Sequence, residues 1–210
     1  MAARTKPKAT DDGTRIVPAN EASWRDLQAI FGNRGEGFVC QCQRYKLQPR
    51  EAFKHYPPEI RAARLKQQTH CGKRNAKSTS GLVAYRDGEP VGWCAVEPRP
   101  NYIGLLRVYR VPWEGRDEDK GDSGIWAVTC FFTRAGYRRQ GVSRALAKAA
   151  IAFARERGAR ALEGYPMNTK GQEIPWGELH VGSRSIFIAA GFKEINRPTP
   201  RRSVMRVDFK

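Results

Sequence analysis

The spacing of the hydrophobic positions changes at Val142, which predicts two kinds of element in succession. Residues 125–133 are almost continuously apolar, as is typical of a strand covered on both faces. From Val142 to Phe153, apolar residues recur at helical spacing and charged residues occupy the positions between them. Residues 160–165 then predict a second strand, which Pro166 ends. This part of the chain is therefore expected to form a strand, a turn, a helix and a strand.

Shorter elements are predicted on both sides of this unit. Trp24, Leu27, Ile30 and Phe31 fall on one face of a helix that Asn20 or Ser23 could cap. The remaining predictions are strands at 14–17, 81–85, 90–96, 192–196 and 203–209, and helices at 50–55, 59–68 and 182–190. Alternating strands and helices predict a mixed α/β (α+β) fold.

The composition fits one globular domain with a short tail. The chain has 210 residues, of which 40% are hydrophobic, and this is enough to fill a substantial core. Residues 1–13 are polar and predict a flexible basic tail, followed by a single domain at 14–210. Residues 98–123 predict a long excursion that could cover a site.

The cysteine count and the hydropathy pattern indicate a cytoplasmic location. Five cysteines, an odd number, argue against a disulfide framework. No apolar run reaches membrane-spanning length, and the N-terminus lacks the apolar region of a signal peptide. We therefore expect no membrane partner.

The charge is strongly positive. The 38 Lys and Arg against 21 Asp and Glu give a formal net charge of +17. Such a field attracts polyanions, which include nucleic acid and acidic small molecules. A nucleic-acid partner is therefore possible on charge alone, although the excess is spread along the chain rather than gathered in one block.

The turn at 134–143 has the composition of an anion site. It holds Gly136, Gly141 and three arginines, and it leads into the N-terminus of the predicted helix. Backbone N–H groups and the helix dipole favour a phosphate there, and glycine allows close approach. An ordinary strand–helix turn with solvated arginines is the alternative at this point.

Several motifs in order resemble the GNAT acyltransferase superfamily. Residues 138–143 (RRQGVS) resemble its Arg/Gln-x-x-Gly-x-Gly/Ala signature, and residues 183–192 resemble its last helix, which ends in Gly-Phe. Cys40-Gln41-Cys42 and residues 92–99 are similar to those of a bacterial subfamily of unassigned substrate. The resemblance covers about residues 80–197.

The resemblance implies a fold, a reaction and a binding site. The fold would be a mixed sheet of about six to seven strands with a splayed parallel pair and helices on both faces. The reaction would be transfer of an acetyl group from acetyl-CoA to a small-molecule amine by direct attack in a ternary complex, with no metal. The implied acetyl-CoA contacts are Phe131, Phe132 and Thr133 for pantetheine, Arg138, Arg139, Gln140, Gly141, Val142 and Ser143 for the pyrophosphate, and Ser183 and Phe187 from the last helix.

The catalytic positions depart from the superfamily pattern. Phe187 stands where a tyrosine often protonates the leaving thiolate, His180 where an asparagine is frequent, and Thr129 where a glutamate often acts as base. The candidate bases are therefore Glu163 and Glu97, which strand placement sets near the cleft, and His180.

Other functions remain open from the sequence. The charge would suit an RNA-binding, tRNA-directed protein, and the missing tyrosine would suit a non-catalytic acyl-CoA sensor. A metal site at Cys40, Cys42, His70 and Cys71 is disfavoured, because one residue between paired cysteines is an awkward spacing for zinc. Either a monomer or a homodimer fits the sequence.

Overall fold

A seven-stranded mixed sheet forms the centre of the computed structural model, which describes residues 13–107, 110–170, 174–175 and 177–210. The strands are β1 (Arg15–Pro18), β2 (Leu82–Arg86), β3 (Glu89–Pro98), β4 (Ile125–Thr133), β5 (Ala161–Gly164), β6 (Lys193–Thr199) and β7 (Arg202–Asp208). Their order is β1-β2-β3-β4-β5-β7-β6. Among these strands, β4 and β5 form the parallel pair and every other neighbouring pair is antiparallel. The expected mixed sheet is confirmed.

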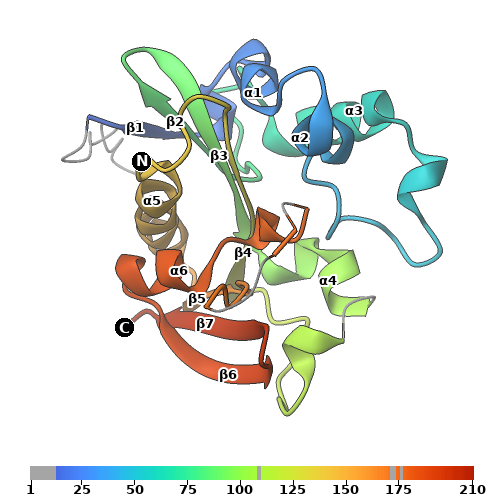
Figure 1. Ribbon diagram of the computed structural model, residues 1–210, viewed down its shortest axis with the longest axis vertical. Helices are drawn as coiled ribbons and strands as arrows, with labels where there is room; N and C mark the ends of the chain where they lie inside the picture. Colours follow the sequence, from blue (N-terminus) through green and yellow to red (C-terminus); the bar gives the residue numbers. More distant parts are fainter. Residues whose placement is uncertain (1–12, 108–109, 171–173, 176) are drawn as a thin grey trace.

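Helices cover both faces of the sheet (Figure 1). They are α1 (Trp24–Phe31), α2 (Gly35–Cys40), α3 (Pro58–Thr69), α4 (Ile103–Arg107), α5 (Val142–Glu156) and α6 (Arg184–Ala190). Helices α5 and α6 lie together on one side, and α1 to α3 lie on the other. The short helical turns are 3-10 helices at Ala19–Glu21, Phe53–His55, Arg99–Asn101, Val111–Trp113 and Leu179–Val181.

Strand alternation divides the core between these two layers. Leu82 and Ala84 of β2 belong to the apolar cluster that contains α5, while Val83 and Tyr85 belong to the cluster that contains α1. Helix α5 approaches β3 at Gly92, where an added Cβ would lie 2.5 Å from the Val142 side chain. Residue 92 therefore has to be glycine for this helix to sit so close to the sheet.

The parallel pair separates before β4 ends. Its register runs from Ile125 opposite Ala161 to Val128 opposite Gly164, where β5 stops. On its other side, β4 continues to pair with β3 as far as Thr133. Residues 129–133 therefore have no strand partner on the β5 side within the described chain, and the splay expected between these strands is present.

The structure corrects some predicted boundaries. Residues 50–55 do not form a helix of that length, since only Phe53–His55 is helical, as one 3-10 turn. Helix α2 was not predicted, because two of its six residues are glycines, which disfavour helices. The excursion at 98–123 contains α4 and two 3-10 turns. The predicted tail lies outside the described residues except for Gly13, which is exposed.

Candidate active site

A cavity of about 830 Å³ lies along the unpaired end of β4. Its walls come from the segment around α2, the end of β4, the turn before α5, Thr169 and residues 177–186. The lining residues are Phe31, Arg34, Gly35, Glu36, Gly37, Cys40, Cys42, Arg44, Cys130, Phe131, Phe132, Thr133, Arg138, Arg139, Ser143, Thr169, Gly177, Leu179, His180, Gly182, Ser183 and Ile186. Pockets of this size accommodate a large organic ligand.

The turn before α5 presents an open helix N-terminus to this cavity. Gly141 is the N-cap residue with φ +84°, and no side chain caps the first turn of this 15-residue helix. The Thr133 and Ser143 hydroxyls lie 3.2 Å apart and join the strand end to the helix start. Arg138 and Arg139 line the adjoining wall. Free N–H groups, a helix dipole and two guanidinium groups favour an anion at this point.

The cavity brings together seven of the eleven residues expected to contact acetyl-CoA. These are Phe131, Phe132, Thr133, Arg138, Arg139, Ser143 and Ser183. The remaining four support the walls instead. Gln140 accepts a hydrogen bond from Arg86 and donates one to the Gly136 carbonyl, and Gly141 shapes the turn. Val142 and Phe187 are buried in the core.

Phe187 has a packing role at the point where the strands separate. Its ring lies between Phe131 and Phe192, with ring centroids 5.7 and 4.9 Å away. An added Cβ at Gly164, the last residue of β5, would lie 2.0 Å from this ring. The Phe187 ring thus occupies the space that a side chain at position 164 would need. The ring carries no proton donor.

His180 is the one candidate base that lines the cavity. Its Nδ1 donates to the Gly177 carbonyl at 2.7 Å, so the lone pair is on Nε2, which is buried and has no hydrogen-bond partner. Burial lowers the pKa of His180 to about 4, and the positive charge of Arg44 acts in the same direction. The imidazole is therefore neutral near pH 7.

Glu163 lies in a buried ion cluster, outside the cavity lining. Its side chain is fully buried, and Arg116 and Arg206 contact Oε1 at 2.6 and 3.2 Å. Arg99 lies 3.3 Å from Oε2, to which the Tyr165 hydroxyl also donates at 2.8 Å. Every lone-pair direction has a partner, which is the arrangement of a structural carboxylate rather than of a free base.

Glu97 also lies outside the cavity lining. It is buried opposite Ala127 of β4, where Lys46 forms an ion pair with it and Asn101 donates a hydrogen bond at 2.9 Å. Burial lowers the pKa of Lys46, while Glu97 opposes this effect. Neither predicted glutamate therefore meets the cavity.

Sequence reasoning missed several residues that do meet it. Glu36 is the single carboxylate among the described lining residues, and it comes from the unpredicted helix α2. Helix α2 rests against the Phe132 ring at Gly37, where an added Cβ would lie 2.4 Å from the ring. Glycine thus has two effects here: it lowers the helix propensity of this segment, and at Gly37 it allows the helix to approach the cavity.

The cysteines suggested as metal ligands are arranged differently. Cys40 and Cys42 line the cavity together with Cys130, while His70 bonds to the Ser78 carbonyl at 3.0 Å. Within the described ranges, no group of three or more His, Cys, Asp or Glu side chains is placed to hold a metal ion.

Comparison with known proteins assigns the family. The sequence model of the "Acetyltransferase (GNAT) family" matches residues 42–170, more than half of the chain. The chain belongs to the GNAT acetyltransferase family. The match includes β4 and the turn before α5, which form one side of the cavity, while α2 and residues 177–186 lie outside the matched range. No curated protein matches the chain.

Solved structures share the GNAT fold at low sequence identity. A GCN5-related N-acetyltransferase from Kribbella flavida is 17% identical with a TM-score of 0.52, covering 95% of this chain and 100% of that one. An N-acetyltransferase from Staphylococcus aureus Mu50 is 15% identical with a TM-score of 0.52, covering 94% and 99%. A ribosomal-protein-alanine N-acetyltransferase from Brucella melitensis is 18% identical with a TM-score of 0.50, covering 92% and 99%.

The helices of this GNAT protein are short or carry charged residues. None in the described part of the chain combines the length and the apolar character that a membrane crossing requires.

Proposed function

We propose that this protein transfers an acetyl group from acetyl-CoA to an amine by direct attack in a ternary complex. The observation that carries the proposal is the unpaired end of β4, of which residues 130–133 line the cavity beside the uncapped N-terminus of α5. An extended ligand with an amide backbone can bind to a free strand edge, and a pyrophosphate can bind to a helix N-terminus. Acetyl-CoA carries both groups.

The lining offers a matching sequence of surfaces for acetyl-CoA. Arg138, Arg139 and Ser143 stand where the phosphates would bind. The backbone of residues 131–133 would bind the pantetheine arm and stabilise the oxygen of the thioester carbonyl as charge develops on it. The Phe131 and Phe132 rings supply apolar contact beside the acyl group.

The acceptor amine would enter on the side of α2. Glu36 is exposed in the first turn of that helix, and its carboxylate would attract an ammonium group into a cavity whose other charged lining residues are arginines. An alkyl ammonium must lose a proton before it attacks, since its pKa is about 10. Glu36 is the carboxylate in the lining that can accept this proton, while the Nε2 atom of His180 is buried and its ring has a lowered pKa.

The departing thiolate needs no dedicated side chain. Phe187 offers no proton, and a thiolate is a good leaving group that solvent can protonate. The Thr133 and Ser143 hydroxyls, which line the cavity, could pass this proton.

Titration calorimetry with coenzyme A tests the binding site. The double substitution Arg138→Ala/Arg139→Ala should raise Kd about tenfold or more, because charge-assisted contacts to phosphate are lost. Lys148→Ala, at an exposed position of α5, is the matched control and should leave Kd unchanged. Equal affinities in both variants would contradict the phosphate site.

Release of thiol from acetyl-CoA with a panel of amines tests the reaction. The panel includes small alkyl and aromatic amines, amino acids and peptides with a free N-terminus. Amine-dependent thiol release, with a matching acetylated product, is the expected result. Tight coenzyme A binding without release for any amine would instead favour the non-catalytic sensor.

A further inference from the structure

Two thiols meet at one wall of the cavity. The Sγ atoms of Cys42 and Cys130 are 2.6 Å apart, although 88 positions separate the two residues in the sequence. The Trp93 indole N–H also donates to Cys42 Sγ, at 3.0 Å. Both cysteines line the cavity, so a small molecule in it can reach them. The two sulfurs are within reach of a disulfide bond, which needs about 2.05 Å between them.

The backbone that carries Cys42 is held in an uncommon conformation. Gln41 and Cys42 both have positive φ, at 47° and 51°. This region is costly for residues other than glycine, so two such residues in a row require strong support. The support comes from side-chain amides: Gln41 and Gln28 of α1 exchange two hydrogen bonds, at 3.0 and 3.3 Å.

A second pair of amides fixes the other end of the same segment. Gln43 and Gln68 of α3 exchange hydrogen bonds of 2.9 and 3.2 Å, and Gln43 also donates to the Gln41 carbonyl at 3.2 Å. Gln41 and Gln43 are almost fully buried. The segment is thus anchored on both sides of Cys42, and this anchoring aims its thiol at β4.

We propose that Cys42 and Cys130 form a reversible disulfide when a hydroperoxide enters the cavity. One thiolate attacks the peroxide oxygen and becomes a sulfenic acid, releasing water or an alcohol. The other thiol then attacks the sulfenic sulfur, and a second water leaves as the S–S bond forms. Two thiols lose two electrons and two protons in total, and one peroxide is reduced.

The reduced pair should react slowly with peroxide near neutral pH. Burial raises the pKa of the Cys42 thiol well above its usual value, and the contact with Cys130 adds to this effect. A protonated thiol is a poor nucleophile, so the pair resists slow adventitious oxidation. We therefore expect oxidation to be faster at pH 8.5 than at pH 7.

The other cysteines serve as internal comparisons. Cys94 is fully buried and belongs to the apolar cluster on the α5 side of the sheet, and Cys71 contacts the α1 side without lining the cavity. Cys40 is the main competitor of Cys42 for the bond to Cys130, because it lines the same cavity and only Gln41 separates it from Cys42.

Peptide mapping of the full chain tests the proposal. The reduced protein is freed of reductant, treated with hydrogen peroxide, alkylated and digested with trypsin. The expected product links peptide 35–44, which carries Cys40 and Cys42, to peptide 121–134, which carries Cys130. Its mass should be lower than the sum of the two reduced peptides by two hydrogens, and dithiothreitol should abolish it.

Single substitutions identify which cysteine reacts. The link should persist in Cys40→Ser and vanish in Cys42→Ser. An oxidised protein in which peptide 121–134 stays fully alkylated, or in which Cys40 and Cys42 join within one peptide, would overturn the proposal. The measurement needs no acyl-CoA, so failure of the proposed acetyl transfer would not affect it.

Thermal melting gives a second readout that requires no variant. A bond that joins the segment after α2 to β4 closes a long loop, so the oxidised protein should melt about 5 °C or more above the reduced one. Reduction should return the melting temperature to its starting value. An unchanged or lowered melting temperature in linked protein would contradict the geometry on which the proposal rests.

Discussion

At the scale of single residues, His180 shows how burial fixes a protonation state. The ring is held by one hydrogen bond to the Gly177 carbonyl, and its second nitrogen has no partner. Because the pKa of this group is lowered to about 4, the folded protein excludes a proton that the unfolded chain binds below pH 6.5. The folded state should thus lose stability on acidification.

We expect His180→Gln to remove part of this pH dependence. A lowered folded-state pKa means that stability is fully present above pH 6.5 and decreases as the pH falls towards 4. Between pH 7 and pH 5 the free energy of unfolding should fall by about 2 kcal/mol more in the wild type than in the variant. Urea denaturation at both pH values measures the difference.

His55→Gln is the matched control for this experiment. His55 is exposed in the 3-10 turn at Phe53–His55, so its replacement should leave the pH dependence as it is. If the free energy of unfolding changes equally with pH in the wild type and in His180→Gln, the buried ring is not the source of the pH dependence.

At the scale of elements, α5 has two glycines with similar backbone geometry and different surroundings. Gly141 precedes the helix with φ +84°, and Gly158 follows it with φ +78°. An added Cβ at Gly158 would meet nothing within 4 Å. Backbone strain should therefore be similar at the two ends, while only Gly141 adjoins the residues that line the cavity.

Gly141→Ala and Gly158→Ala should separate binding from strain. Each should lower the free energy of unfolding by about 1 kcal/mol, because alanine is disfavoured at positive φ. Only Gly141→Ala should also weaken coenzyme A binding, since its methyl group obstructs approach to the first helical N–H groups. Calorimetric titration of both variants with coenzyme A measures the difference. An equal loss of affinity in the two variants would contradict the placement of the phosphate site at the N-terminus of α5.

Elements with strong periodicity were predictable, and those that depend on distant contacts were not. Strand β4 and helix α5 follow from local pattern alone. Helix α2 forms because Gly37 allows it to rest on Phe132, a contact that no local pattern contains. Likewise, alternation could place Glu163 and Tyr165 on one face, but it could not reveal that three arginines from distant segments converge there.

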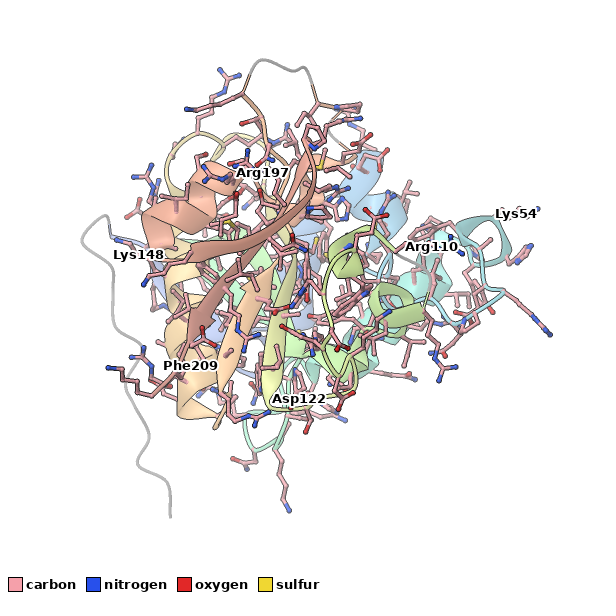
Figure 2. The ribbon with its side chains drawn as sticks, turned by 90° about the horizontal axis from the view of Figure 1, so that it is seen from below. Lys54, Arg110, Asp122, Lys148, Arg197 and Phe209 are labelled. Carbon is pink, nitrogen blue, oxygen red and sulfur yellow. The ribbon has the colours of Figure 1, made fainter. Side chains whose placement is uncertain are left out.

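At the scale of the whole molecule, the positively charged side chains are arranged differently on the surface and in the interior. On the surface it is spread over the molecule, and the labelled Lys54 and Lys148 come from opposite sides (Figure 2). Inside, it is concentrated around Glu163, which joins Arg99 and Arg116 of the excursion to Arg206 of β7. The inner cluster therefore ties the excursion to the sheet.

Glu163→Gln should destabilise the protein without affecting the reaction itself. Loss of the carboxylate leaves buried guanidinium groups uncompensated, which should lower the free energy of unfolding by about 3 kcal/mol. Glu178→Gln, which breaks an exposed pair with Arg201, should cost less than about 1 kcal/mol. Chemical denaturation compares the two variants.

Turnover of the folded Glu163→Gln protein distinguishes the two roles considered for this residue. If Glu163 is a structural group, the Glu163→Gln substitution should leave kcat unchanged once the fraction of folded protein is taken into account. A loss of about 10²-fold in kcat at wild-type stability would instead identify it as the general base.

The position of β1 at the edge of the sheet has a consequence for biosynthesis. β1 ends at Pro18 and pairs with β2, which begins only at Leu82, so the first strand leaves the ribosome long before its partner. Pairings across such separations also form slowly. Until β2 and β3 emerge, the apolar side of α1, with Leu27 and Phe31, has no sheet to cover. The nascent chain should therefore expose this apolar surface, of the kind that chaperones bind, for a time that depends on how fast residues 19–98 are translated.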